Sequence, residues 1–173
     1  MPSGEHIELT RRAISWMRPR VTNSGQRWAS EIKIADGYVA DAGTIANLQF
    51  RFFEELAGGN DIKWDRMFFL FEAKVSRADY FNMFHPEKKG NRWVPVANVH
   101  YIVTPKGMVD PDEVPTFWGL LEKSHQGLRQ IKKPIYCEMS EVEMWRMGYL
   151  ILWGGYSRRA NIEDWEIRKQ GNK

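Results

Sequence analysis

The strongest constraint on the fold comes from one apolar segment, Met67 to Val75, which carries two opposite charges near its end. Side chains alternate along a strand, so Glu72 and Lys74 share one face with Phe68 and Leu70. A run this apolar is typical of a central strand that is covered on both faces. A carboxylate and an ammonium group are costly there unless they pair or bind a ligand. The segment therefore predicts a central strand whose charged end is a candidate functional site.

The composition sets the class of protein around this strand. The chain has 173 residues, 43% hydrophobic and 27% charged, which predicts one soluble globular domain over residues 1–156 and a C-terminal tail over 157–173. Lys and Arg total 25 against 22 for Asp and Glu, which permits a polyanionic partner without requiring one. A single cysteine, Cys137, excludes an intramolecular disulfide. With no targeting signal and no long apolar run, we expect a cytoplasmic protein without a membrane partner.

Local patterns predict the order of the other elements. Apolar residues at helical spacing predict a helix from about Glu5 to Arg18, and Pro19 ends it. Asp36-Gly37 predicts a hairpin turn between two extended segments, Arg27 to Ile34 and Tyr38 to Leu48. The polar stretch from Glu54 to Asp65 reads as a loop or a bulging connection.

The second half of the chain alternates helix and strand signals. Ser76 to Asp79 has the form of a capping box and predicts a helix directly after the apolar strand. Further strands are predicted at Val96–Val103, Phe117–Glu122 and Gly127–Ile131, and a second capping box at Ser140 predicts a helix through Leu152. This order favours an α/β (α+β) fold with a mixed central sheet flanked by helices.

A second carboxylate gives the charged strand end a chemical interpretation. Asp41 lies in the preceding strand between small residues, which leave room for a metal ion and a phosphate. Mg²⁺ prefers a few carboxylate oxygens and keeps several waters, so Asp41, Glu72 and the backbone carbonyl of Ala73 could hold it. Lys74 would lower the pKa of the attacking water or hold charge on the attacked phosphate. The set predicts phosphodiester hydrolysis.

These residues resemble the PD-(D/E)xK nuclease superfamily. Asp41, then Glu72-Ala73-Lys74, then Val75-Ser76-Arg77-Ala78-Asp79-Tyr80 are similar to the branch of the MmcB-like DNA repair proteins and related small phage and bacterial nucleases. The resemblance covers roughly Glu31 to Glu122, with Ala40 in place of the proline that names the motif.

The resemblance implies a restriction-endonuclease-like core in the order αβββαβ. It implies a Mg²⁺- or Mn²⁺-dependent deoxyribonuclease, acting in DNA repair, recombination or phage DNA processing. Asp41, Glu72 and Lys74 would be catalytic, Asp41 and Glu72 would ligate the metal, and Glu31 would be an additional metal ligand. Two-fold dimers are common in the superfamily, so a homodimer is a further expectation.

Basic residues outside this set are candidates for DNA contact. Arg77 begins the predicted helix, where backbone N–H groups already favour anions, and Lys88, Lys89 and Arg92 form a basic loop. Ordinary solvated charges are the simpler interpretation of all four. No nucleotide-binding motif is present, so no nucleotide cofactor is expected.

Two alternatives to the enzyme remain open on these residues. One is a non-catalytic nucleic-acid-binding or regulatory protein that retains the nuclease fold. The other is a structural α/β domain in which Glu72 and Lys74 form a surface ion pair, a contact that contributes about 0–1 kcal/mol.

Overall fold

The computed structural model describes residues 3–21, 27–33, 39–46, 67–84, 97–140 and 143–144 of the chain. Its elements follow in the order α1 (Gly4–Met17), η1 (Arg18–Arg20), β1 (Arg27–Lys33), β2 (Val39–Ala46), β3 (Met67–Ala73), α3 (Arg77–Phe84), β4 (Val99–Thr104), η3 (Pro111–Glu113), β5 (Trp118–Ser124) and β6 (Gly127–Lys132).

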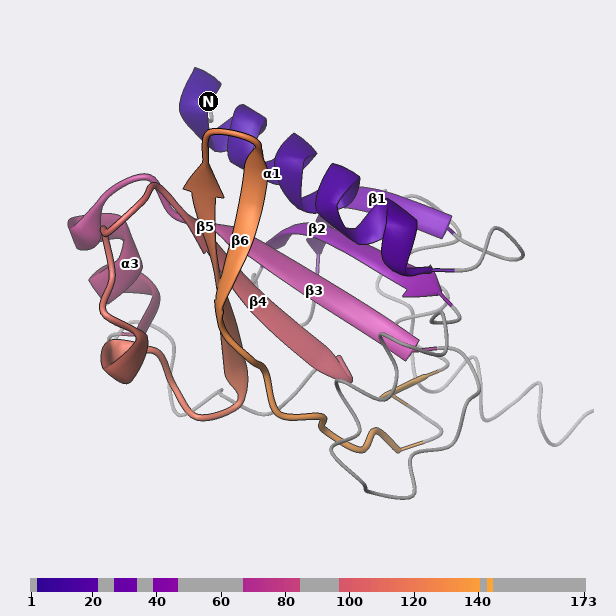
Figure 1. The fold of residues 1–173 in the computed structure, drawn as a ribbon. Coiled ribbons are helices and arrows are strands. Elements are labelled where there is room, and N and C mark those ends of the chain that lie inside the picture. Colours follow the sequence, from indigo (N-terminus) through magenta and orange to yellow (C-terminus); the bar gives the residue numbers. More distant parts are fainter. Residues whose placement is uncertain are drawn as a thin grey trace, which may run out of the picture.

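The strands form one mixed sheet (Figure 1) with the order β1-β2-β3-β4-β5-β6. Pairs β1–β2 and β2–β3 are antiparallel, β3–β4 and β4–β5 are parallel, and β5–β6 is again antiparallel. Between β3 and β4 the chain crosses over through α3, as two parallel neighbours require. The predicted mixed sheet is confirmed, including the two strands after residue 116.

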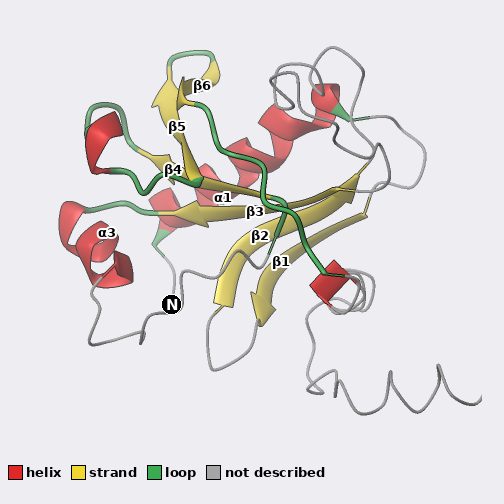
Figure 2. Cartoon of the chain, turned by 90° about the horizontal axis from the view of Figure 1, so that it is seen from below, coloured by secondary structure: helices red, strands yellow, loops and turns green. Residues whose placement is uncertain are grey.

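Each face of the sheet packs against a helix (Figure 2). Phe69 and Phe71 of β3 belong to a buried cluster with Leu9 and Met17 of α1. On the other face, Tyr80 and Met83 of α3 pack with residues of β4 and β5, Ile102, Trp118 and Leu120. Phe68 and Leu70 belong to a third cluster, apart from Phe69 and Phe71, so the side chains of β3 alternate as predicted.

Helix α1 forms as its apolar spacing predicts. Leu9, Ala13, Trp16 and Met17 are its buried residues, and the Ser3 side chain accepts a hydrogen bond from the backbone N–H of His6. The helix gives way to a short 3-10 turn that contains the predicted terminator, Pro19. The helix thus covers one face of the sheet.

Helix α3 begins at the predicted capping residue. The Ser76 hydroxyl accepts a hydrogen bond from the backbone N–H of Asp79 at 3.1 Å. Ser140 and Glu143 also form their predicted capping contacts, with the Ser140 backbone N–H donating to Glu143 Oε2 at 2.9 Å. Most of the helix predicted there, and the connection from Glu54 to Asp65, lie outside the described residues. Among the helices that are described, none has the length and apolarity of a membrane span.

Candidate active site

Glu72 and Lys74 form a buried ion pair at the end of the most apolar strand. Glu72 is 1% exposed and Lys74 9%, and Lys74 Nζ lies 3.2 Å from Glu72 Oε2. The interpretation of these charges as a surface pair is therefore wrong, since burial removes the water that would solvate them. A buried pair gains little net stability over apolar residues of the same size. Its position at a strand end favours a role in binding.

Asp41 lies next to this pair where β2 and β3 separate. The last paired residues are Ala42 and Phe71, so the next step along the register sets Asp41 opposite Glu72. Asp41 Oδ2 accepts a hydrogen bond from the backbone N–H of Ala73 at 2.7 Å. The Asp41 side chain on β2 thus binds the backbone of Ala73 on β3, the residue that lies between Glu72 and Lys74 in the sequence.

The charges of the site act together on Lys74. Burial alone lowers the pKa of its ammonium group, but the carboxylates of Glu72, Asp41 and Asp79 outweigh burial and raise the pKa above its ordinary value. Lys74 is therefore a cation at neutral pH. It can donate hydrogen bonds or stabilise negative charge, and it is not a general base in this state.

His6 is a site residue that the sequence did not indicate. Its Nε2 lies 3.0 Å from Asp41 Oδ1, and the two side chains are 20% and 16% exposed. Asp41 thus has one oxygen facing β3 and the other facing α1. No local pattern connects the first turn of a helix with a strand residue so much later in the chain, because only the packing of α1 on the sheet creates the contact.

Glu31, the additional ligand implied by the resemblance, lies on β1 beside Asp41. Its neighbours pair as Ser30 with Ala42 and Ile32 with Ala40, which sets Glu31 opposite Asp41. Its φ of 52° is uncommon for a residue with a side chain and marks local strain. Within the described residues, no hydrogen bond or ion pair joins the exposed Glu31 to Asp41, Glu72 or Lys74.

The donor set suits a hard cation. Asp41 and Glu72 supply two carboxylates, and Mg²⁺ is commonly held by one or two of these together with waters and substrate phosphates. Asp41 accepts a hydrogen bond from the backbone of Ala73, the residue after Glu72, so the two carboxylates lie close together where β2 and β3 separate. No cluster of three or more His, Cys, Asp or Glu residues with metal-site geometry occurs among the described residues. The Ala73 carbonyl remains a proposed third donor.

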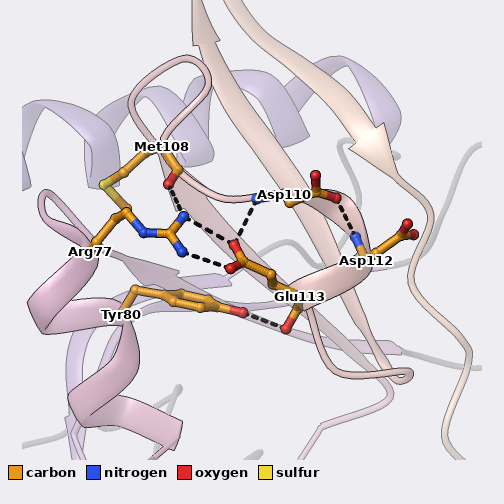
Figure 3. Close-up of polar contacts among 6 residues, drawn as sticks. All are labelled: Arg77, Tyr80, Met108, Asp110, Asp112 and Glu113. Carbon is orange, nitrogen blue, oxygen red and sulfur yellow. Dashed lines mark hydrogen bonds and ion pairs between the residues drawn. The ribbon is translucent and has the colours of Figure 1, made fainter.

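Arg77, a predicted phosphate contact, is engaged by an acidic partner (Figure 3). Its guanidinium donates to both carboxylate oxygens of Glu113, at 2.6 and 3.0 Å, and to the Met108 carbonyl at 2.9 Å. The Tyr80 hydroxyl donates to the Glu113 carbonyl at 2.7 Å. The side chain of Arg77 is still 48% exposed. Lys88, Lys89 and Arg92 lie outside the described residues.

Comparison with known proteins adds information about the fold. No family model matches the chain, and no curated protein matches it. A solved structure described as the SPO1766 protein of unknown function from Silicibacter pomeroyi is similar, with a TM-score of 0.60 and 12% identity. The match covers 88% of this chain and 87% of the other. At this identity the likeness shows the fold alone.

Proposed function

We propose that this protein is a metal-dependent nuclease that hydrolyses phosphodiester bonds in DNA. The observation that carries the proposal is the buried Glu72–Lys74 pair beside Asp41, whose carboxylate is bound to the Ala73 backbone between them. Perturbed and buried charges of this kind cluster at functional sites. The proposal also rests on the resemblance of these residues to the PD-(D/E)xK superfamily.

The order of elements supports the same proposal. A helix precedes three antiparallel strands, and a second helix leads to a strand parallel to the third. This arrangement supports the proposal, because the resemblance implies a core in the order αβββαβ. Asp41 lies on the second strand, Glu72 lies on the third and Lys74 follows it directly, which agrees with the roles that the resemblance implies for them.

Each residue would have a distinct role in the reaction. Asp41 and Glu72 would hold Mg²⁺ or Mn²⁺, which when bound supplies Lewis acidity at the scissile phosphate. Lys74 would donate hydrogen bonds to the phosphate oxygens and stabilise the charge that develops as water attacks. The Ala73 backbone keeps Asp41 oriented through its N–H. Buried surroundings strengthen each of these interactions because little water screens them.

A cleavage assay tests this proposal. Plasmid, linear duplex, single-stranded and branched DNA would each be incubated with the whole chain in Mg²⁺, Mn²⁺ or EDTA. We expect metal-dependent cleavage that is lost in Asp41→Asn and in Lys74→Ala. Lys123→Ala is the matched control, because it also removes a lysine of an ion pair, but one that pairs with Glu8 of α1 and not with Asp41 or Glu72, so cleavage should stay intact. Near-ultraviolet circular dichroism confirms that each variant is folded. Cleavage that survives both site substitutions refutes the proposal.

One observation favours a second candidate, a non-catalytic nucleic-acid-binding protein with this fold. Both carboxylate oxygens of Asp41 already face partners, the Ala73 N–H and His6 Nε2, and Glu72 is paired with Lys74. A cation at these carboxylates would compete with His6 and Lys74 for them. Calorimetric titration with Mn²⁺ separates the two candidates, because only the nuclease requires a cation here.

A further inference from the structure

Lys74 of the buried pair begins a row of polar residues that crosses three neighbouring parallel strands. The Lys74 backbone N–H donates to the Val103 carbonyl at 2.9 Å, which extends the β3–β4 pairing one residue past Ala73. Lys74 is thereby set beside Thr104, and Thr104 pairs with Glu122 of β5. Residues abreast on neighbouring strands point to the same face. Lys74, Thr104 and Glu122 therefore form one row at the carboxyl ends of β3, β4 and β5.

Thr104 stands out in this row because its hydroxyl is unpaired within the described part of the chain. The residue is fully buried, and Thr104 Oγ1 makes no hydrogen bond to the described residues. Glu122, by contrast, accepts a hydrogen bond from the Gly107 backbone N–H at 3.0 Å. Buried hydroxyls are nearly always paired, so an unpaired one next to a buried cation calls for a cause.

The hydrogen bonds of Lys74 suggest a role for the Thr104 hydroxyl. An ammonium group has three donors, and one of them points to Glu72 Oε2 in this structure. If the Glu72 carboxylate rotated to ligate a cation, Lys74 would lose this hydrogen bond. A buried ammonium group left without an acceptor is strongly unfavourable. Glu122 lies two strands away, roughly 10 Å at the usual strand spacing, whereas Thr104 is adjacent.

We propose that Thr104 is the second acceptor for the Lys74 ammonium group and holds it in place once Glu72 engages the cation. The inference rests on the proposed nuclease function and deepens it. Thr104 is a positioning residue, since its hydroxyl acts on the phosphate only through Lys74. The exchange of partners keeps the remaining Lys74 protons directed at the substrate while Glu72 serves as a ligand.

The test replaces the hydroxyl without changing the volume of the side chain. Thr104→Val removes it and Thr104→Ser restores it. Thr44→Val is the matched control, because Thr44 is also a fully buried threonine. It lies on β2 opposite Phe69, on the face of the sheet that α1 covers, and its hydroxyl donates a hydrogen bond to the Ile45 carbonyl at 3.2 Å. Each variant is measured for Mn²⁺ affinity by calorimetry, for its urea midpoint without metal, and for kcat and KM on plasmid DNA.

We expect Thr104→Val to keep or raise the metal-free urea midpoint, since it removes an unpaired buried hydroxyl. Its Mn²⁺ affinity should fall about tenfold, the value of one hydrogen bond to a buried charge. Its kcat should fall while KM for DNA is unchanged, and Thr104→Ser should restore both affinity and kcat.

Two outcomes overturn the inference while leaving the nuclease proposal in place. One is wild-type Mn²⁺ affinity and kcat in Thr104→Val, and the other is a lower metal-free urea midpoint, which would show that the hydroxyl already has a structural partner. A wild-type protein that neither binds Mn²⁺ nor cleaves DNA overturns the proposed function and this inference with it.

Discussion

The buried Glu72–Lys74 pair makes a quantitative prediction about stability. At a distance of 3.2 Å and an effective dielectric constant of about 20, Coulomb's law gives an attraction of about 5 kcal/mol. Removing either partner leaves the other charge buried and should lower the free energy of unfolding by about 3–5 kcal/mol. Replacing both residues with uncharged ones of similar size should lower the free energy of unfolding by far less than the sum of the two single changes.

The assay is a double-mutant cycle of Glu72→Gln, Lys74→Met and the double variant. Urea unfolding is followed through the fluorescence of the 8 tryptophans at pH 7. We expect a coupling energy above about 2 kcal/mol. The same cycle on the half-buried Glu8–Arg12 pair of α1 is the control and should show a coupling below about 1 kcal/mol. Additive effects at Glu72 and Lys74, within about 0.5 kcal/mol, would refute the reasoning that these charges depend on each other.

Three further predictions concern other parts of the fold. Burial lowers the pKa of His100 from 6.5 to about 4, so on acidification the unfolded state binds this proton before the folded state does. Between pH 7 and pH 4, the free energy of unfolding of the wild type, measured in urea, should therefore fall by about 3 kcal/mol more than that of His100→Leu. The hydrogen bond from Arg77 lowers the pKa of Glu113, so its carboxylate accepts from the Asp110 amide as an anion at neutral pH. Glu113→Gln should therefore speed hydrogen exchange at the Asp110 amide above about pH 5, and equal rates would argue against this hydrogen bond. Gly43→Ala should cost about 1–3 kcal/mol in the same unfolding assay, since the added carbon would lie 3.0 Å from the Phe69 carbonyl oxygen; unchanged stability would contradict this close packing.

The sequence predicts the parts of this structure that depend on local patterns. The capping residue Ser76, the alternation along Met67–Ala73 and the paired strands around Asp36-Gly37 each follow from residues close together in the chain. The charged strand end at Glu72 is visible for the same reason, because two charges interrupt an otherwise apolar run. The apolar residues around His100 indicate a buried position, and it is buried, but they do not reveal that its Nδ1 makes no hydrogen bond to the described residues.

Other parts of the candidate site depend on contacts between distant segments. His6 reaches Asp41 only because α1 packs across the sheet, and Thr104 lies beside Lys74 only through the register of β3 and β4. The positive φ of Glu31 likewise could not be predicted, because no glycine or turn motif marks this position in the sequence. Pairing register and helix placement are set by the whole core, so no window of sequence contains them.

Anomalous diffraction from crystals soaked in Mn²⁺ tests the central claim most directly. If this site binds the metal, an anomalous peak should appear between the carboxylates of Asp41 and Glu72. Lys74 Nζ should then lie farther from Glu72 Oε2. The peak should vanish in Asp41→Asn crystals treated in the same way. A map without a peak at these carboxylates, in wild-type crystals where the Glu72–Lys74 contact of 3.2 Å persists, would contradict the account.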